Sequence, residues 1–148
     1  MHIPIIVTLL LVAAIIIVYK KQLPAPISTV GSTYEKDITE KQFDEMVLET
    51  SKRVPVVVDF YTDWCPPCRN MTPLLAEMAE EYKGAFFLAK INTDKNITLT
   101  AEYGVEEIPT VFLFVDGEPV EKFTGSKLAH NIRFTLAKHG ILEPRGVA

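Results

Sequence analysis

Hydrophobic residues fill the amino-terminal part of the chain without leaving a polar face. From Ile3 to Tyr19 the sequence reads IPIIVTLLLVAAIIIVY, 17 residues broken only by Pro4 and Thr8. A helix of this length spans about 25 Å, which is short but sufficient for the hydrocarbon core of a bilayer. A helix on a globular core has an apolar stripe on one side only, whereas β-branched residues surround this one. The pattern therefore predicts a single transmembrane helix at residues 3–19.

The rest of the chain shows two other patterns of apolar residues. After a linker at residues 20–33, which has two prolines, one glycine and no periodicity, helical spacing alternates with short apolar runs. Helical spacing predicts helices at residues 39–51, 66–82, 96–103 and 127–139. Apolar runs predict strands at residues 54–61, 85–92, 111–115 and 119–124, the last two joined by a hairpin turn at Asp116-Gly117. This order predicts an α/β domain with a mixed sheet at residues 34–142, followed by a tail at residues 143–148.

The charge of the chain bears on whether it binds nucleic acid. The chain has 148 residues, 15 of them basic and 19 acidic, for a net charge of −4. Lys20 and Lys21 are the only charged residues before the domain, so the remainder keeps 13 basic residues against 19 acids, a net charge of −6. An acidic domain repels the phosphate backbone, so we expect no nucleic-acid partner.

Both cysteines of the chain lie in the run WCPPC at residues 64–68, directly after a predicted strand. Two thiols at this spacing can close a disulfide on each other. Cys65 would lie at the amino end of the helix that Pro66 begins, where free N–H groups and the helix dipole favour a negative sulfur. Cys65 is therefore predicted to be the attacking thiolate, and Cys68, one turn further on, the thiol that resolves the mixed disulfide.

A CxxC pair has two other interpretations. Half of a zinc site would need two more ligands, but His2 precedes the predicted anchor, and His130 and His139 are nine residues apart. A pair of inert buried thiols is the other interpretation, and the proline-rich, exposed setting expected for the motif argues against it. We therefore expect a redox pair with no metal and no organic cofactor.

Five segments of the domain together resemble the thioredoxin family. They are VVVDFYTDWCPPC, Pro73, KINTD, IPT and the DGE hairpin, and they occur in order and at thioredoxin-like spacing across residues 34–142. The resemblance implies a thioredoxin fold, a mixed central sheet flanked by helices, with an active-site disulfide at the start of the second helix. Two positions differ from the commonest pattern, because Pro66 stands where glycine is usual and Tyr61 where tryptophan is usual. The redox potential and the choice of partner therefore do not carry over.

Asp59 is an acid inside an apolar strand, six residues before Cys65. Burial of a carboxyl without a partner is costly, so Asp59 is expected either at a strand end near water or with a raised pKa. In the resemblance, Asp59 matches the buried acid that assists proton transfer to and from Cys68. Lys90, in the following strand, matches the partner of that acid; an ordinary exposed lysine is the alternative.

The segment Ile108-Pro109-Thr110 places a proline at the start of a strand, a position that tolerates it. The resemblance implies that Pro109 belongs to a cis-proline loop, which packs against the disulfide and pairs with an extended substrate segment by strand addition. Trp64, next to the nucleophile, would supply an apolar platform. The expected substrate-binding residues are Trp64, Pro67, Ile108 and Pro109.

The resemblance implies a protein-disulfide oxidoreductase that reduces substrate disulfides, with Cys65, Cys68, Asp59 and Lys90 as its catalytic residues. Its partners would be protein clients with disulfides or dithiols and an upstream dithiol electron donor. Two alternatives remain open. One is an extracytoplasmic thiol-disulfide oxidoreductase with a narrow client, as in cytochrome c maturation or envelope-thiol pathways. The other is a binding module that uses the scaffold without redox turnover.

The amino-terminal segment bears on the location. A cleaved signal peptide usually has a positive region before its apolar run, but only Met1 and His2 precede this one, so we expect a retained anchor. Lys20 and Lys21 follow the run, and the positive-inside rule then favours a domain on the cytoplasmic face. Many bacterial relatives with one such helix nevertheless work outside the cytoplasm. A cytoplasmic domain implies a donor like thioredoxin reductase, and an outer domain implies a membrane relay.

Overall fold

The computed structural model describes residues 3–22, 34–125 and 128–144. Helix α1 (Ile3–Gln22) includes the predicted anchor and the first three residues of the predicted linker. Those three residues, two lysines and a glutamine, are good helix formers, which suits the continuation of the helix over them. Among the residues that the structure describes, no helix is long and apolar enough to cross a membrane. The rest of the predicted linker and most of the predicted tail lie outside the described residues.

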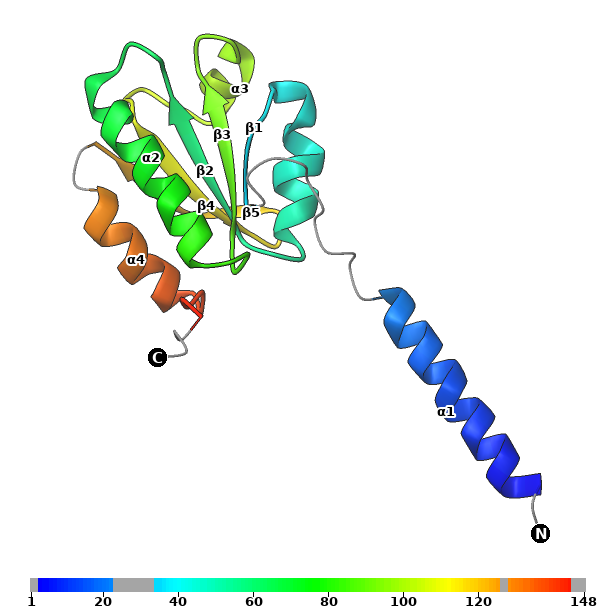
Figure 1. Cartoon of the computed structure of the whole chain (residues 1–148). Helices are drawn as coiled ribbons and strands as arrows, with labels where there is room; N and C mark the ends of the chain where they lie inside the picture. Colours follow the sequence, from blue (N-terminus) through cyan, green and yellow to red (C-terminus); the bar gives the residue numbers. More distant parts are fainter. Residues whose placement is uncertain (1–2, 23–33, 126–127, 145–148) are drawn as a thin grey trace.

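A five-stranded mixed sheet forms the centre of the domain (Figure 1). Its strand order is β1-β3-β2-β4-β5. The first three strands in this order are parallel, and β4 and β5 are antiparallel to their neighbours. The strands are β1 (Glu35–Asp37), β2 (Val56–Tyr61), β3 (Phe87–Asn92), β4 (Thr110–Val115) and β5 (Glu118–Thr124). The predicted α/β fold with a mixed sheet is therefore confirmed.

The helices of the domain fall where the apolar spacing places them. They are the 3-10 helix η1 (Glu40–Gln42), the π-helix η2 (Asp44–Glu49), α2 (Pro66–Glu81), α3 (Ile97–Glu102) and α4 (Leu128–Lys138). The predicted helix at residues 39–51 is thus a short 3-10 turn followed by a π-helix. At its start the Gln42 side chain accepts a hydrogen bond from the N–H of Thr39 at 3.1 Å. Apolar spacing over three turns does not distinguish these helix types from an α-helix.

Helices cover both faces of the sheet. Helices α2 and α4 lie side by side on one face, and η1, η2 and α3 lie on the other (Figure 1). Side chains alternate along β2, so Val56, Val58 and Phe60 join the core beneath η2 and α3, while Val57 joins the core beneath α2. The next residue on the α2 face of β2 is Asp59. The fold thus directs this acid toward the helix that carries both cysteines.

Strand β1 (Glu35–Asp37) was missed from the sequence. It is a three-residue edge strand that pairs in parallel with β3, and its residues Glu, Lys and Asp carry no apolar alternation. Its position is therefore set by pairing with β3 and not by a hydrophobic pattern of its own. This pairing places Asp37 opposite Lys90.

The predicted hairpin turn is confirmed. Asp116 and Gly117 have φ angles of 54° and 83°, the left-handed conformation that a type I′ hairpin turn requires at both central positions. The two backbone N–H groups of the turn donate to Ser51, to its carbonyl oxygen at 2.9 Å and to its hydroxyl at 2.8 Å.

Candidate active site

The chain passes from the end of β2 into α2 through the WCPPC run, with Cys65 as the residue that caps the helix. The Sγ atom of Cys65 accepts a hydrogen bond from the N–H of Cys68 at 3.3 Å. Pro66 and Pro67 are the first two helical residues and have no N–H, so the N–H of Cys68 is the first that α2 can offer. A donor and a helix amino terminus at this sulfur both favour its negative charge.

Cys65 and Cys68 form a disulfide, with their Cα atoms 5.3 Å apart. Only 4% of Cys65 and 2% of Cys68 is exposed. The exposed setting expected for the motif is therefore correct for Pro66 and Pro67 but wrong for the cysteines themselves. The loop that precedes β4 lies against Cys65.

That loop contains Ile108 and Pro109, joined by a cis peptide bond, as the resemblance implied. The carbonyl oxygen of Ile108 lies 3.7 Å from Sγ of Cys65. Pro109 is buried and Ile108 half-buried, and the carbonyl oxygen of Pro109 accepts a hydrogen bond from the N–H of Gly125 at 3.2 Å. The structure thus brings the predicted loop against the predicted nucleophile.

Trp64 lies at the surface beside the disulfide, with 66% of the residue exposed. Its indole N–H donates to Oδ2 of Asp94 at 2.9 Å, which fixes the direction of the ring. Pro67 is also exposed. Trp64 and Pro67, two of the predicted substrate-binding residues, are thus exposed apolar side chains on either side of Cys65 in the sequence.

Asp59 is completely buried. Its Oδ2 atom accepts a 2.7 Å hydrogen bond from the hydroxyl of Thr72, on α2, and its Oδ1 atom has no hydrogen-bond partner among the described residues. Burial raises the pKa of Asp59 to about 6, while the Thr72 hydroxyl and then the charge of Lys90 act in the opposite direction. Of the two positions expected for Asp59, a strand end near water or an interior position with a raised pKa, the structure therefore shows the second.

Lys90 is the register partner of Asp59 in the parallel pair of β2 and β3. Its Nζ atom forms ion pairs with Oε2 of Glu35 and Oδ2 of Asp37, each at 3.3 Å. Among the described residues, the ammonium thus pairs with carboxylates of β1 and acts on Asp59 through its charge. The pKa of Lys90 is raised, because these carboxylates outweigh the opposing effect of its burial.

A pocket of about 270 Å³ opens beside Cys68. It is lined by Tyr61, Thr62, Asp63, Cys68, Arg69, Thr72 and Pro73. Thr72 was not among the predicted site residues, although it follows Cys68 by four positions. That spacing places two residues on the same face of a helix, and it is the sequence feature from which Thr72 could have been identified as a site residue.

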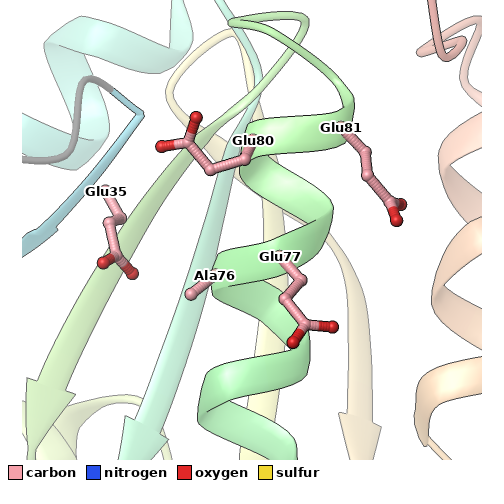
Figure 2. Close-up of a pocket in the computed structure, with 5 residues that line it drawn as sticks. All are labelled: Glu35, Ala76, Glu77, Glu80 and Glu81. Atoms are coloured by element: carbon pink, nitrogen blue, oxygen red, sulfur yellow. The ribbon is translucent and has the colours of Figure 1, made fainter.

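A second pocket, of about 440 Å³, lies between β1 and the second half of α2 (Figure 2). It is lined by Ala76 and four glutamates, Glu35, Glu77, Glu80 and Glu81. The carboxylate of Glu81 points toward the α4 side in Figure 2 and pairs with Arg133 at 2.6 Å. The carboxylates therefore do not converge, and within the described part of the chain no group of three or more acids, histidines or cysteines could hold a metal ion.

Comparisons with known proteins agree with this geometry. The family model described as thioredoxin matches residues 35–138. Thioredoxin 1 of Synechococcus elongatus is 38% identical over 102 residues, and thioredoxin of Pyropia yezoensis is 40% identical over 102 residues. Each match covers 69% of this chain and 94% of the relative. Thioredoxin of Staphylococcus haemolyticus is 37% identical over the same length. The chain therefore belongs to the thioredoxin family and is a thiol-disulfide oxidoreductase whose redox pair is Cys65 and Cys68.

Proposed function

We propose that the chain is a membrane-tethered reductase of protein disulfides. The observation that carries the direction of attack is the position of Cys65, which caps α2 and accepts the N–H of Cys68. Reduced Cys65 would ionise there more readily than a free cysteine. The Ile108 carbonyl oxygen, 3.7 Å from the same sulfur, lies where the backbone of an extended client segment would pair with the loop.

The reaction has two exchange steps. The Cys65 thiolate attacks one sulfur of the client disulfide, forming a mixed disulfide and releasing the other client sulfur as a thiolate, which takes a proton from water. The carboxylate of Asp59 accepts the Sγ proton of Cys68, and the Cys68 thiolate attacks Cys65. The bond between Cys65 and the client breaks, and this second client sulfur leaves as a thiolate that takes a proton from water, so the client is released as a dithiol. Asp59 then gives its proton back to water. Two electrons pass from the protein to the client, and a dithiol donor must return two to the Cys65–Cys68 disulfide.

Reduction of insulin by the full chain in detergent, with excess dithiothreitol as donor, tests this proposal. We expect faster precipitation of the insulin B chain than with dithiothreitol alone, and loss of that acceleration in Cys65→Ser. A chain that performs no better than dithiothreitol would refute the reductase function.

Covalent trapping tests the order of the two cysteines. Cys68→Ser should accumulate a mixed disulfide between Cys65 and a client, visible as a dithiothreitol-sensitive band on a non-reducing gel, and Cys65→Ser should accumulate none. Bands in both variants would contradict the order. Noncovalent client binding without any trapped band would favour a binding module on the same scaffold.

The proposed tether rests on the sequence alone: residues 3–19 carry no charge and are broken only by Pro4 and Thr8, and two lysines follow them. The same lysines support a domain on the cytoplasmic face, with a donor similar to thioredoxin reductase. Carbonate extraction of membranes should leave the full chain in the pellet, and release into the supernatant would refute the tether. A membrane-impermeant maleimide should label the reduced cysteines only after intact cells are permeabilised. Labelling of intact cells would instead favour an extracytoplasmic enzyme with a narrow client and a membrane relay as donor.

A further inference from the structure

We infer that Thr72 is a positioning residue for the resolving step: its hydroxyl holds Oδ2 of Asp59 and connects this buried acid to the pocket that Cys68 lines. The inference rests on the role proposed above for Asp59. The hydrogen bond from Thr72 Oγ1 to Asp59 Oδ2 is 2.7 Å long, as short as charge-assisted O–H···O bonds usually are.

Among the residues that line the pocket beside Cys68, Thr72 is the one that hydrogen-bonds to Asp59. Asp59 is 0% exposed and does not line the pocket of about 270 Å³, so the acid has no surface of its own there. Thr72 both lines that pocket and hydrogen-bonds to Asp59. Cys68 lines the same pocket one helical turn earlier. Thr72 is therefore the contact between the acid and the space beside the resolving sulfur.

The two carboxylate oxygens of Asp59 are then divided in function. Oδ2 is occupied by the Thr72 hydroxyl, and Oδ1 has no hydrogen-bond partner among the described residues. An unpaired oxygen in a buried carboxylate is costly, so Oδ1 is the atom with most to gain from the Cys68 proton. The Thr72 bond limits rotation of the carboxyl and keeps Oδ1 available for that transfer.

The remaining surroundings of Asp59 cannot replace this hydroxyl. Lys90, on β3, is held by the carboxylates of Glu35 and Asp37, and Asp37 itself disfavours a second negative charge nearby. On β4 the register partner of Asp59 is the apolar Val111. A hydroxyl that donates to a carboxylate stabilises its ionised form. Without it, Asp59 would keep its proton to higher pH, and a smaller fraction of it would be ionised to accept the Cys68 proton at a given pH.

Four variants of the full chain in detergent separate the hydroxyl from the shape of the side chain. Thr72→Val keeps the shape and removes the donor, Thr72→Ala is a second variant without a donor, and Thr72→Ser keeps the donor. Asp59→Asn identifies the Asp59 signal in carboxyl ¹³C NMR. The titration is recorded on the oxidised protein, where neither cysteine ionises, so it needs no turnover.

We expect the Asp59 titration in the parent chain to have its midpoint near pH 6. In Thr72→Val and Thr72→Ala the midpoint should rise by about one pH unit, the usual effect of one hydrogen bond to a charged group, and Thr72→Ser should stay close to the parent. An unchanged midpoint in the two variants without a donor, or an equal rise in Thr72→Ser, would overturn the inference.

A rate measurement connects the titration to the reaction. The reduced chain is mixed with excess 5,5′-dithiobis(2-nitrobenzoate), which releases one thiolate when Cys65 attacks and a second when Cys68 resolves the mixed disulfide. The rate of the second release should fall at acidic pH as Asp59 becomes protonated. In Thr72→Val this acid limb of the pH–rate profile should move to higher pH by the same amount as the NMR midpoint. A moved midpoint with an unmoved limb would overturn the role of Thr72 in the resolving step. Failure of the reductase function would instead appear as equal insulin reduction with and without the parent chain, whatever the titration shows.

Discussion

Asp59 and Lys90 lie side by side as register partners of β2 and β3, yet the ammonium of Lys90 forms its ion pairs with Glu35 and Asp37 on β1. The lysine thereby ties the edge strand to the sheet while its charge still favours ionisation of Asp59. One side chain thus contributes both to the stability of the edge and to the electrostatics of the site.

Substitution Lys90→Met should reveal both contributions. Glu35 and Asp37 would lose their common cation, so we expect the free energy of unfolding to fall by about 2 kcal/mol in urea denaturation. The pKa of Asp59 should rise further, because the nearby positive charge is lost. Lys138→Met is the matched control, since Lys138 pairs with Glu121 on the surface with 62% of its side chain exposed, and it should cost less than about 0.5 kcal/mol. Equal stability of the two variants would contradict the structural role of Lys90.

Trp64 is predicted to act on client binding and hardly on the fold. Because 66% of the residue is exposed, Trp64→Ala should change the free energy of unfolding by less than about 1 kcal/mol. The KM for insulin should rise about 3-fold to 10-fold, as expected when an aromatic contact is removed from an interface. The rate with a small aromatic disulfide should stay within about twofold, because that substrate spans less of the surface. Phe134→Ala removes an aromatic ring on α4 that is 73% exposed and should leave the KM unchanged; a comparable rise there would argue against a specific surface at Trp64.

The parts of the molecule that were predicted from sequence are those with a repeating or local signal. Apolar runs and helical spacing located four of the strands and the helices, and the place of Cys65 at the amino end of α2 follows from a helix that begins at Pro66. Strand β1 has three polar residues and is placed by pairing with β3, so it carries no such signal. The Thr72 contact with Asp59 depends on how α2 packs over β2, a tertiary relationship that spacing within one element does not fix.

Pro66 should keep the pKa of the Cys65 thiol higher than it would be with a residue that has an N–H at position 66. Pro66 and Pro67 remove two N–H groups from the first turn of α2, and Cys68 supplies the first remaining donor to Sγ. Pro66→Ala restores one N–H at the helix terminus. In a Cys68→Ser background, the pH midpoint of Cys65 alkylation by iodoacetamide should therefore fall by about half a unit.

Pro73→Ala provides the control for this effect. It restores an N–H in the same helix, but two turns beyond Pro66 and away from the helix terminus, so the alkylation midpoint should not move. A fall of equal size in both variants would show that a general change in α2, and not a donor near Cys65, is responsible.

Burial of Asp59 should make the oxidised protein less stable at neutral pH than at mildly acidic pH. The pKa of Asp59 is about 6 in the folded state against an ordinary value of 3.8, because burial penalises the charged form. Between these two values the folded state binds more protons than the unfolded state, so this group's contribution to stability falls as the pH rises from 3.8 to about 6 and is constant above. The full difference corresponds to about 3 kcal/mol.

Asp59→Asn removes the ionisation while keeping the size of the side chain. At about pH 8 the variant should be more stable than the parent by up to about 3 kcal/mol in urea denaturation with the disulfide intact, and the difference should nearly vanish at about pH 4. Asp44→Asn, a change at an exposed acid of η2, should give a difference below about 0.5 kcal/mol at both pH values. A parent chain that is more stable than Asp59→Asn at about pH 8 would mean that ionised Asp59 is better solvated or paired than its burial indicates, and the acid would then lack the raised proton affinity on which its role toward Cys68 depends.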